Sequence, residues 1–205
     1  MKRLFDIVAA AAGLIVLCPL FAVIAVLIKW DSDGPVFFRQ SRIGRHFRPF
    51  FIYKFRTMLS DAPAIGPLLT VGDDPRITRV GRWLRRTKLD ELPQLINILT
   101  GDMSFVGPRP EVERYVRLFR TEYAEILQVR PGITDLASLK YRAESTLLAR
   151  SPKPEEEYVT RILPDKLRLG QQYVRELSLG RDVMLIARTL AAVVRPTDSA
   201  GSQGR

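Results

Sequence analysis

The most prominent pattern in the chain is a long apolar run near its N-terminus. Residues 7–28 carry no charged side chain. A straight helix of this length extends about 33 Å, which is enough to cross a hydrocarbon core of about 30 Å. A signal peptide fits less well, because its apolar region usually has only about 7–15 residues. The pattern therefore predicts a membrane helix.

Pro19 lies in the middle of this run, directly after Cys18, and leaves two topologies open. A proline inside a helix removes a backbone donor and clashes with the preceding turn. The helix therefore either spans the membrane with a kink, or breaks near Cys18 and Pro19 and returns to the same face. Lys2 and Arg3 precede the run and Lys29 follows it. Since basic flanks tend to remain cytoplasmic, they slightly favour the re-entrant form without deciding between the two.

Beyond residue 28 the pattern changes from stretch to stretch. Residues 36–40 and 50–56 are rich in aromatic and β-branched side chains and lie on either side of Gly44, which predicts a β-hairpin. Residues 63–75 contain several Gly, Pro and Asp and predict a loop. Residues 196–205 are mostly polar or small and predict a disordered tail.

Sets of apolar residues at helical spacing predict helices in the remainder. They are Ile77, Val80 and Leu84; Leu92, Leu95, Ile96 and Leu99; Val112, Val116, Phe119 and Tyr123; and Val183, Ile186, Leu190 and Val193. The chain lacks the alternation of strands and helices from which a doubly wound sheet is built. The predicted fold class is therefore α+β and mostly helical, with a small β-hairpin in a compact domain.

An excess of basic residues adds an expectation about partners. The chain has 32 Lys and Arg against 22 Asp and Glu, a formal net charge of +10. Such an excess favours an anionic partner, namely a nucleic acid, an acidic membrane surface or a phosphate-bearing substrate. The single cysteine and single histidine exclude an internal disulfide and a Cys/His zinc cluster. Catalysis would therefore depend on carboxylates, Lys, Arg, Tyr or a hard metal ion.

The adjacent acids Asp90 and Glu91 are the first candidates for chemistry. Pro93 is tolerated only in a first helical turn, so a helix is expected to begin near Asp90. A helix N-terminus favours anions and suits phosphate binding. The alternative is an N-cap followed by an ordinary first-turn acid. Adjacent helical residues point about 100° apart, so the two acids cannot form a facing dyad and need different roles.

Arg109 is the second candidate, because Pro108 and Pro110 fix the backbone on both sides of it. A rigidly held guanidinium is suited to binding phosphate through two parallel hydrogen bonds. The alternative is a turn whose arginine faces solvent.

Further basic residues lie close to these candidates in the sequence. Lys54 and Arg56 end the predicted hairpin and either bind an anion or form a charged strand edge. A basic run ends directly before Asp90 and suits anionic lipid headgroups, while its last members, Arg85 among them, reach toward a phosphate. The run consists of Arg76, Arg79, Arg82, Arg85, Arg86 and Lys88. The Asp31-Ser32-Asp33 triplet is expected to be only a polar helix end.

Four stretches, in this order, resemble the bacterial sugar transferase family, the monotopic polyprenyl-phosphate phosphoglycosyl transferases. They are KRLFDIVAAAAGLIVLCP from Lys2, KFRTM from Lys54, LDELPQLINILTGDMSFVGPRPE from Leu89 and RPGIT from Arg130. The resemblance extends to about Arg195, and the long third stretch is highly specific.

The resemblance implies that a sugar-1-phosphate moves from a UDP-sugar to undecaprenyl phosphate, with release of UMP. It implies a re-entrant membrane helix over residues 1–30, a cytosolic catalytic domain over 31–195 and a disordered tail over 196–205. The expected location is the cytoplasmic face of the bacterial inner membrane, in contact with membrane lipids. The oligomeric state, including a homo-oligomer, stays open.

The resemblance also assigns roles. Asp90 is the expected nucleophile and forms a covalent phosphosugar, with Mg²⁺ held near Asp90 and Glu91. A carboxylate that attacks a diphosphate meets like-charge repulsion, so cationic groups are required. Arg109 and Arg85 are expected to supply them, followed by Lys54 and Arg56.

Two positions depart from the family pattern. Many members have Ser before the membrane proline, whereas this chain has Cys18, a weaker hydrogen-bonding partner for a broken helix. Many continue RPGIT with Gly, whereas Asp135 follows here. Two rival functions stay open: a membrane-tethered basic nucleic-acid-binding protein and a structural membrane scaffold. The first lacks a recognisable reader module, so no nucleic-acid partner is expected.

Overall fold

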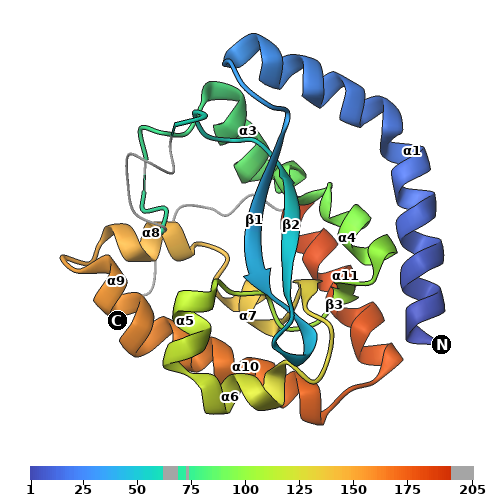
Figure 1. Cartoon of the computed structure of the whole chain (residues 1–205), viewed down its shortest axis with the longest axis vertical. Helices are drawn as coiled ribbons and strands as arrows, with labels where there is room; N and C mark the ends of the chain where they lie inside the picture. Colours follow the sequence, from blue (N-terminus) through green and yellow to red (C-terminus); the bar gives the residue numbers. More distant parts are fainter. Residues whose placement is uncertain (62–68, 73, 195–205) are drawn as a thin grey trace.

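The chain folds into a mostly helical body with a long N-terminal helix and two small sheets in the part that the structure describes. This computed structural model describes residues 1–61, 69–72 and 74–194. Figure 1 shows the long helix following one side and one end of the body, while a hairpin crosses its face. The elements are α1 (Lys2–Asp31), β1 (Phe37–Ile43), η1 (Arg45–Phe47), β2 (Pro49–Phe55), α3 (Arg79–Thr87), η2 (Leu89–Glu91), α4 (Gln94–Thr100), β3 (Ser104–Val106), α5 (Glu113–Leu118), α6 (Arg120–Ile126), β4 (Gly132–Thr134), α7 (Leu136–Lys140), α8 (Glu144–Ala149), α9 (Pro154–Glu157), η3 (Tyr158–Ile162), α10 (Leu163–Arg175) and α11 (Leu179–Val194).

Helix α1 confirms the predicted apolar helix but not the expected interruption. It continues from Lys2 to Asp31 with Pro19 inside it, so the chain does not break at Cys18 and Pro19. Figure 1 shows that the helix instead bends as it passes over the body. A proline often kinks a helix without ending it, because the hydrogen bonds on either side of the kink persist.

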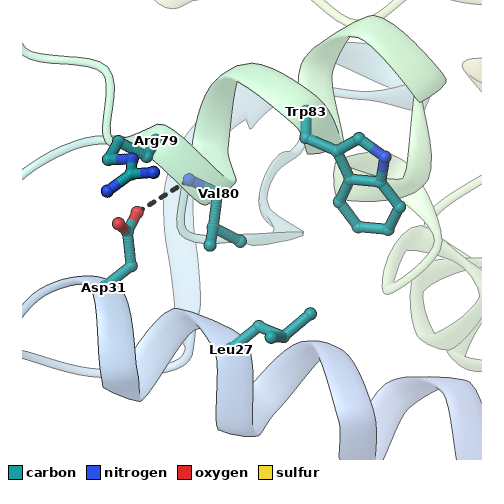
Figure 2. A pocket seen from close by; sticks show the side chains of 5 residues that line it. All are labelled: Leu27, Asp31, Arg79, Val80 and Trp83. Carbon is teal, nitrogen blue, oxygen red and sulfur yellow. Dashed lines mark hydrogen bonds between the residues drawn. The ribbon is translucent and has the colours of Figure 1, made fainter.

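Both ends of α1 are attached to the same body by polar side chains. Near its start, Lys2 pairs with Asp182 of α11, and Arg3 donates to the carbonyl oxygens of Ile98 and Leu99 in α4, at 2.5 and 3.0 Å. At its end, Asp31 accepts the backbone N–H of Val80 at 2.8 Å (Figure 2). The triplet that begins at Asp31 is thus a polar helix end, as expected.

The outer surface of α1 is apolar and open. The helix is long and apolar enough to cross a membrane by length and composition, and only 11% of its most apolar stretch is buried in the body. Its exposed large side chains include Leu4, Ile7, Val8, Ile15, Val16, Val23, Val26 and Trp30. The opposite side packs on the body through Ala10, Ile24 and Ile28. Helix α1 therefore lies on the body with an unpartnered apolar face.

The predicted hairpin is confirmed. Strands β1 and β2 pair antiparallel, with Phe38 opposite Lys54 and Gln40 opposite Ile52. Ile52 and Phe55 pack under α1, which fixes the hairpin against this helix. The predicted loop at 63–75 lies mostly outside the described residues, and the predicted tail at 196–205 lies wholly outside them.

A short parallel ladder was not expected from the sequence. Strand β3 pairs with β4, with Ser104 opposite Gly132 and Val106 opposite Thr134. The backbones also meet just beyond the ladder, where a Cβ built on Gly132 would lie 2.1 Å from the nitrogen of Gly107. Only glycine permits this approach. This backbone contact joins the segment that contains Arg109 to the RPGIT segment.

The predicted helices form, with one correction. Helix α11 contains its whole apolar set, whereas α3 and α4 contain theirs except for the first member, since Ile77 and Leu92 lie before the helices begin. The fourth set, from Val112 to Tyr123, forms two helices instead of one, because the backbone leaves the helical region at Phe119 (φ −126°, ψ 44°). Helices α7 to α10 have no counterpart among the predictions. Buried Tyr158 and Leu163 hold the last of them against Tyr115 and Tyr123 in the largest core cluster.

Candidate active site

Asp90 and Glu91 lie in a tight turn, η2, between α3 and α4, and not at the start of a helix as predicted. Lys88 ends α3 in the left-handed conformation (φ 60°), and α4 begins only at Gln94, with Pro93 as its N-cap. The left-handed residue forces the chain into a separate 3₁₀ turn before the next helix can start. The turn directs the two acids into different surroundings.

Asp90 is buried, with 7% of its surface exposed, and its Oδ1 atom has no hydrogen-bond partner among the described residues. Burial raises the pKa of Asp90, and the negative charge of Glu91 adds to this rise. Lys54, Lys88 and Arg85 oppose it, but the net direction is upward. Asp90 is therefore a desolvated carboxyl group with one free oxygen, surrounded by cationic side chains.

Glu91 is firmly paired. Arg109 binds its carboxylate through two guanidinium nitrogens, and Lys54 donates to Oε1 at 2.9 Å. Burial alone would raise the pKa of Glu91, but Arg109 and Lys54 hold it well below its usual value. Glu91 therefore stays charged and positions two cations beside Asp90. The structure thus gives the two acids different surroundings, as the prediction of different roles requires.

Arg109 is held at both its backbone and its side chain. Its backbone N–H donates to Asp135 Oδ2 at 3.1 Å, and Asp135 also caps α7 by accepting the N–H of Ser138 at 2.6 Å. Glu91 and Asp135 raise the pKa of Arg109. Asp135 was identified in the sequence only as a departure from the family pattern. The structure shows that it anchors the segment that contains Arg109.

Lys54 and Arg85 complete the cationic surroundings of Asp90. Burial lowers the pKa of both, while Glu91 and Asp90 oppose this at Lys54 and Asp90 opposes it at Arg85. Arg85 Nε donates to the hydroxyl of Thr57 at 2.9 Å. A Cβ on Gly81 would lie 2.1 Å from the carbonyl oxygen of Thr57, so this glycine allows α3 to approach the end of the hairpin.

Arg56 does not join this cluster, so its predicted role in substrate binding stays a prediction that these contacts do not support. Its guanidinium donates to the carbonyl oxygens of Ser32 and Asp33 and to the hydroxyl of Ser60. Residues two apart in a strand lie on the same face, so a strand that continued through residue 56 would place Arg56 beside Lys54. Strand β2 ends at Phe55, which frees Arg56 from this alternation. Arg56 instead fixes the chain just after α1.

The basic run divides in the structure. Arg76 lies before α3 and forms a buried pair with Asp74, with nitrogen–oxygen distances of 2.6 to 3.1 Å. Arg85 turns inward, whereas Arg79 and Arg82 are exposed. Only part of the run is therefore available to an anionic surface.

Of the two acids, Asp90 has an oxygen that could bind a hard metal ion. The free Oδ1 of Asp90 is the type of ligand that Mg²⁺ prefers, and this ion usually completes its shell with water and substrate phosphates. Both oxygens of Glu91 already accept bonds from Lys54 or Arg109. Among the described residues there is no group of three or more His, Cys, Asp or Glu side chains that could hold a metal. Asp90 is thus the better candidate ligand of the two predicted ones.

Comparison with known proteins identifies the class. The family described as "Bacterial sugar transferase" matches residues 1–196. The chain belongs to this family, as its sequence motifs indicated.

Individual relatives specify the class further. The chain is 39% identical over 204 residues to the UDP-glucose:undecaprenyl-phosphate glucose-1-phosphate transferase of Caulobacter vibrioides, covering 97% of this chain and 71% of the relative. It is 36% identical over 199 residues to the UDP-N-acetylgalactosamine-undecaprenyl-phosphate N-acetylgalactosaminephosphotransferase of Aeromonas hydrophila, covering 95% of this chain and 44% of the relative. It is 37% identical over 195 residues to the UDP-glucose:undecaprenyl-phosphate glucose-1-phosphate transferase of Escherichia coli, covering 93% of this chain and 39% of the relative. The chain thus spans less than half the length of the last two.

Proposed function

We propose that this protein transfers a sugar-1-phosphate from a UDP-sugar to undecaprenyl phosphate and releases UMP. Support comes from the activities for which its relatives are named. The observation that carries the proposal is the buried carboxyl group of Asp90, which has one free oxygen and lies among Lys54, Arg85 and Arg109. This arrangement suits attack on a phosphorus atom that bears negative charge.

The reaction proceeds in two displacements at the same phosphorus. An oxygen of Asp90 attacks the sugar-bearing phosphate, and the bond from that phosphorus to the bridging oxygen breaks, so that UMP leaves with the electron pair. A phosphate oxygen of undecaprenyl phosphate then attacks the aspartyl phosphosugar and frees the carboxylate. Covalent catalysis divides a transfer between two bulky anions into two simpler steps.

The residues around Asp90 stabilise the charge that develops. Arg109, Arg85 and Lys54 present fixed cations in a partly desolvated site, where such contacts are stronger than in water. Glu91 holds Arg109 and Lys54 in place. A divalent cation bound at Asp90 Oδ1 would further neutralise the phosphates of the donor.

Helix α1 suits this function because it brings the site to the lipid. We place the apolar face of α1 in the cytoplasmic leaflet of the inner membrane, with both helix ends on the cytoplasmic side. The contacts of Lys2 and Asp31 with the same body support this re-entrant topology. The soluble donor and the lipid acceptor then use one site in turn.

A pocket between α1 and α3 extends the proposed membrane contact. Figure 2 shows Leu27, Val80 and Trp83 around it, with Arg79 at one end. Tryptophan side chains favour the membrane interface, and an arginine there attracts an anionic headgroup. The rival nucleic-acid function has no comparable support, since Arg76 and Arg85 of the basic run are engaged inside the protein.

The proposal is tested by offering a panel of UDP-sugars to the protein in detergent or membranes with Mg²⁺ and undecaprenyl phosphate. We expect at least one donor to yield both UMP and a polyprenyl-diphosphate-linked sugar. Failure of every donor in a folded, lipid-bound preparation contradicts the proposal.

A further inference from the structure

A polar pocket adjoins the Asp90 cluster and has no role in the mechanism above. Its volume is about 130 Å³, and its walls come from β1, the segment after β3, and α5, α8, η3 and α10. Pockets for drug-sized ligands usually measure about 300–1,000 Å³, so this one accommodates a single ring and not a whole nucleotide. Its polar lining residues include Gln40, Arg42, Arg109, Glu111, Glu144 and Lys166.

Two connections join this pocket to the site. Arg109 lines the pocket and also binds Glu91 beside Asp90. On the hairpin, Lys54 lies opposite Phe38, and Gln40 follows Phe38 by two residues. Residues two apart in a strand lie on the same face. The hairpin face that supplies Lys54 to the site therefore supplies Gln40 to the pocket.

One wall of the pocket is rigid. Glu111 accepts bonds from Arg42 Nη1 at 2.7 Å and from the hydroxyl of Tyr158 at 2.6 Å. Gln40 Oε1 accepts from Arg42 Nη2 at 2.8 Å, so the Gln40 amide nitrogen remains as a donor. The Nε atom of Arg42 is buried and has no partner among the described residues. The wall is thus preorganised and still offers donors.

The opposite wall is made by a charged pair. Lys166 of α10 pairs with Oε2 of Glu144 in α8, and its ammonium group lies 4.9 Å from the ring centroid of Tyr158. The two side chains are only 19% and 25% exposed, so their charges are partly desolvated. This wall offers both an acceptor and a donor.

We propose that this pocket holds the sugar ring of the donor, and that Glu144, Lys166 and Gln40 determine which sugar is accepted. This inference rests on the proposed function. The sugar is bonded directly to the phosphate that Asp90 attacks, whereas the uracil is separated from it by a second phosphate and a ribose. A pocket that shares Arg109 with the site is therefore in reach of the sugar first. Amide, carboxylate and ammonium groups together suit the hydroxyl and acetamido groups of a neutral hexose.

The test compares UDP-glucose, UDP-galactose and their N-acetylated forms as donors for Gln40→Ala, Glu144→Gln, Lys166→Met and the unmodified protein. The matched control is Glu113→Gln, which breaks an exposed ion pair on α5. We expect each pocket variant to change the ratio of kcat/KM between the best and second-best donor by about 10-fold or more, because a charged or polar contact to one hydroxyl is lost. Inhibition by UMP should stay within about 2-fold, and the control should match the unmodified protein.

Each other outcome has a defined meaning. If all donors lose activity equally and UMP inhibits less, the pocket holds the nucleotide, and the inference is wrong. Unchanged donor ratios in three folded variants also overturn it, and thermal melting identifies any variant that is unfolded. Gln40→Ala keeps the inference testable if a change at the Glu144–Lys166 pair disturbs folding. If the unmodified protein uses no UDP-sugar, the proposed function itself is wrong. This outcome is distinct from a failure of the inference, which concerns only the donor ratios of the variants.

Discussion

At the scale of single residues, the two neighbouring acids of η2 differ because their partners differ. Glu91 is bound by two cations, whereas Asp90 is buried and its Oδ1 atom has no partner in the part of the chain that the structure describes. The same turn thus contains a permanently charged anchor and a carboxyl group that is reactive once ionised.

The pH dependence follows from the raised pKa of Asp90. Only the ionised carboxylate attacks phosphorus, so kcat/KM should fall as the pH decreases through a pKa above the ordinary value of 3.8. Lys54 lowers this pKa, and its removal in Lys54→Met should therefore move the acidic limb to higher pH. Lys153→Met, at an exposed position just before α9, is the control and should leave the limb in place. A limb that moves to lower pH in Lys54→Met contradicts this account.

Arg109 should contribute mainly to the chemical step. Loss of a preorganised charged contact typically lowers kcat by about 100- to 1,000-fold, and we expect this for Arg109→Ala. Steady-state kinetics of UMP release measures it, with Arg114→Ala on the exposed side of α5 as the control. An unchanged kcat/KM would remove Arg109 from the site.

At the scale of elements, the close contact of Gly107 with Gly132 determines where Arg109 lies. In Gly132→Ala the new methyl group would meet the backbone of Gly107, so the two segments must separate. We expect a loss of roughly 1–3 kcal/mol in the free energy of unfolding, together with lower activity.

The matched control is Gly180→Ala in α11, where nothing lies within 4 Å of the new Cβ. This change should be neutral or stabilise the protein by up to about 1 kcal/mol, because alanine favours a helix. Chemical denaturation measures both variants, and equal stabilities would refute the role of the glycine contact.

Only the elements with a clear local pattern were predictable. The hairpin follows from its aromatic and β-branched residues, and α3, α4 and α11 follow from the spacing of apolar residues, whereas α7 to α10 were not predicted. The β3–β4 ladder was not, since each strand has only three residues and pairs across a long separation in sequence. The start of α4 was misplaced because no propensity rule indicates that Lys88 adopts a left-handed conformation.

The candidate site was predictable only in part. Asp90, Glu91, Arg109, Arg85 and Lys54 come together, whereas Arg56 forms carbonyl contacts that depend on where α1 ends. Thr57 and Asp135 act through contacts that only the tertiary structure reveals.

At the scale of the whole molecule, α1 contacts the same body near both of its ends, and the proposed re-entrant topology predicts that both ends face the cytoplasm. Cys18 is the only cysteine in the chain, so a Cys18→Ser background allows single labels. We expect Met1→Cys and the exposed Ser145→Cys to react with a membrane-impermeant maleimide only in inside-out vesicles. Labelling of Met1→Cys from the outer face would show that α1 spans the membrane.

The central claim is that Asp90 bonds covalently to phosphorus. It is tested most directly by incubating the protein with its active UDP-sugar, without lipid acceptor, and analysing the peptide that contains Asp90 by mass spectrometry. The account predicts a sugar-phosphate adduct on Asp90, about one UMP released per molecule, and neither in Asp90→Asn. A preparation that turns over with acceptor but shows no adduct, or an active Asp90→Asn variant, would contradict it.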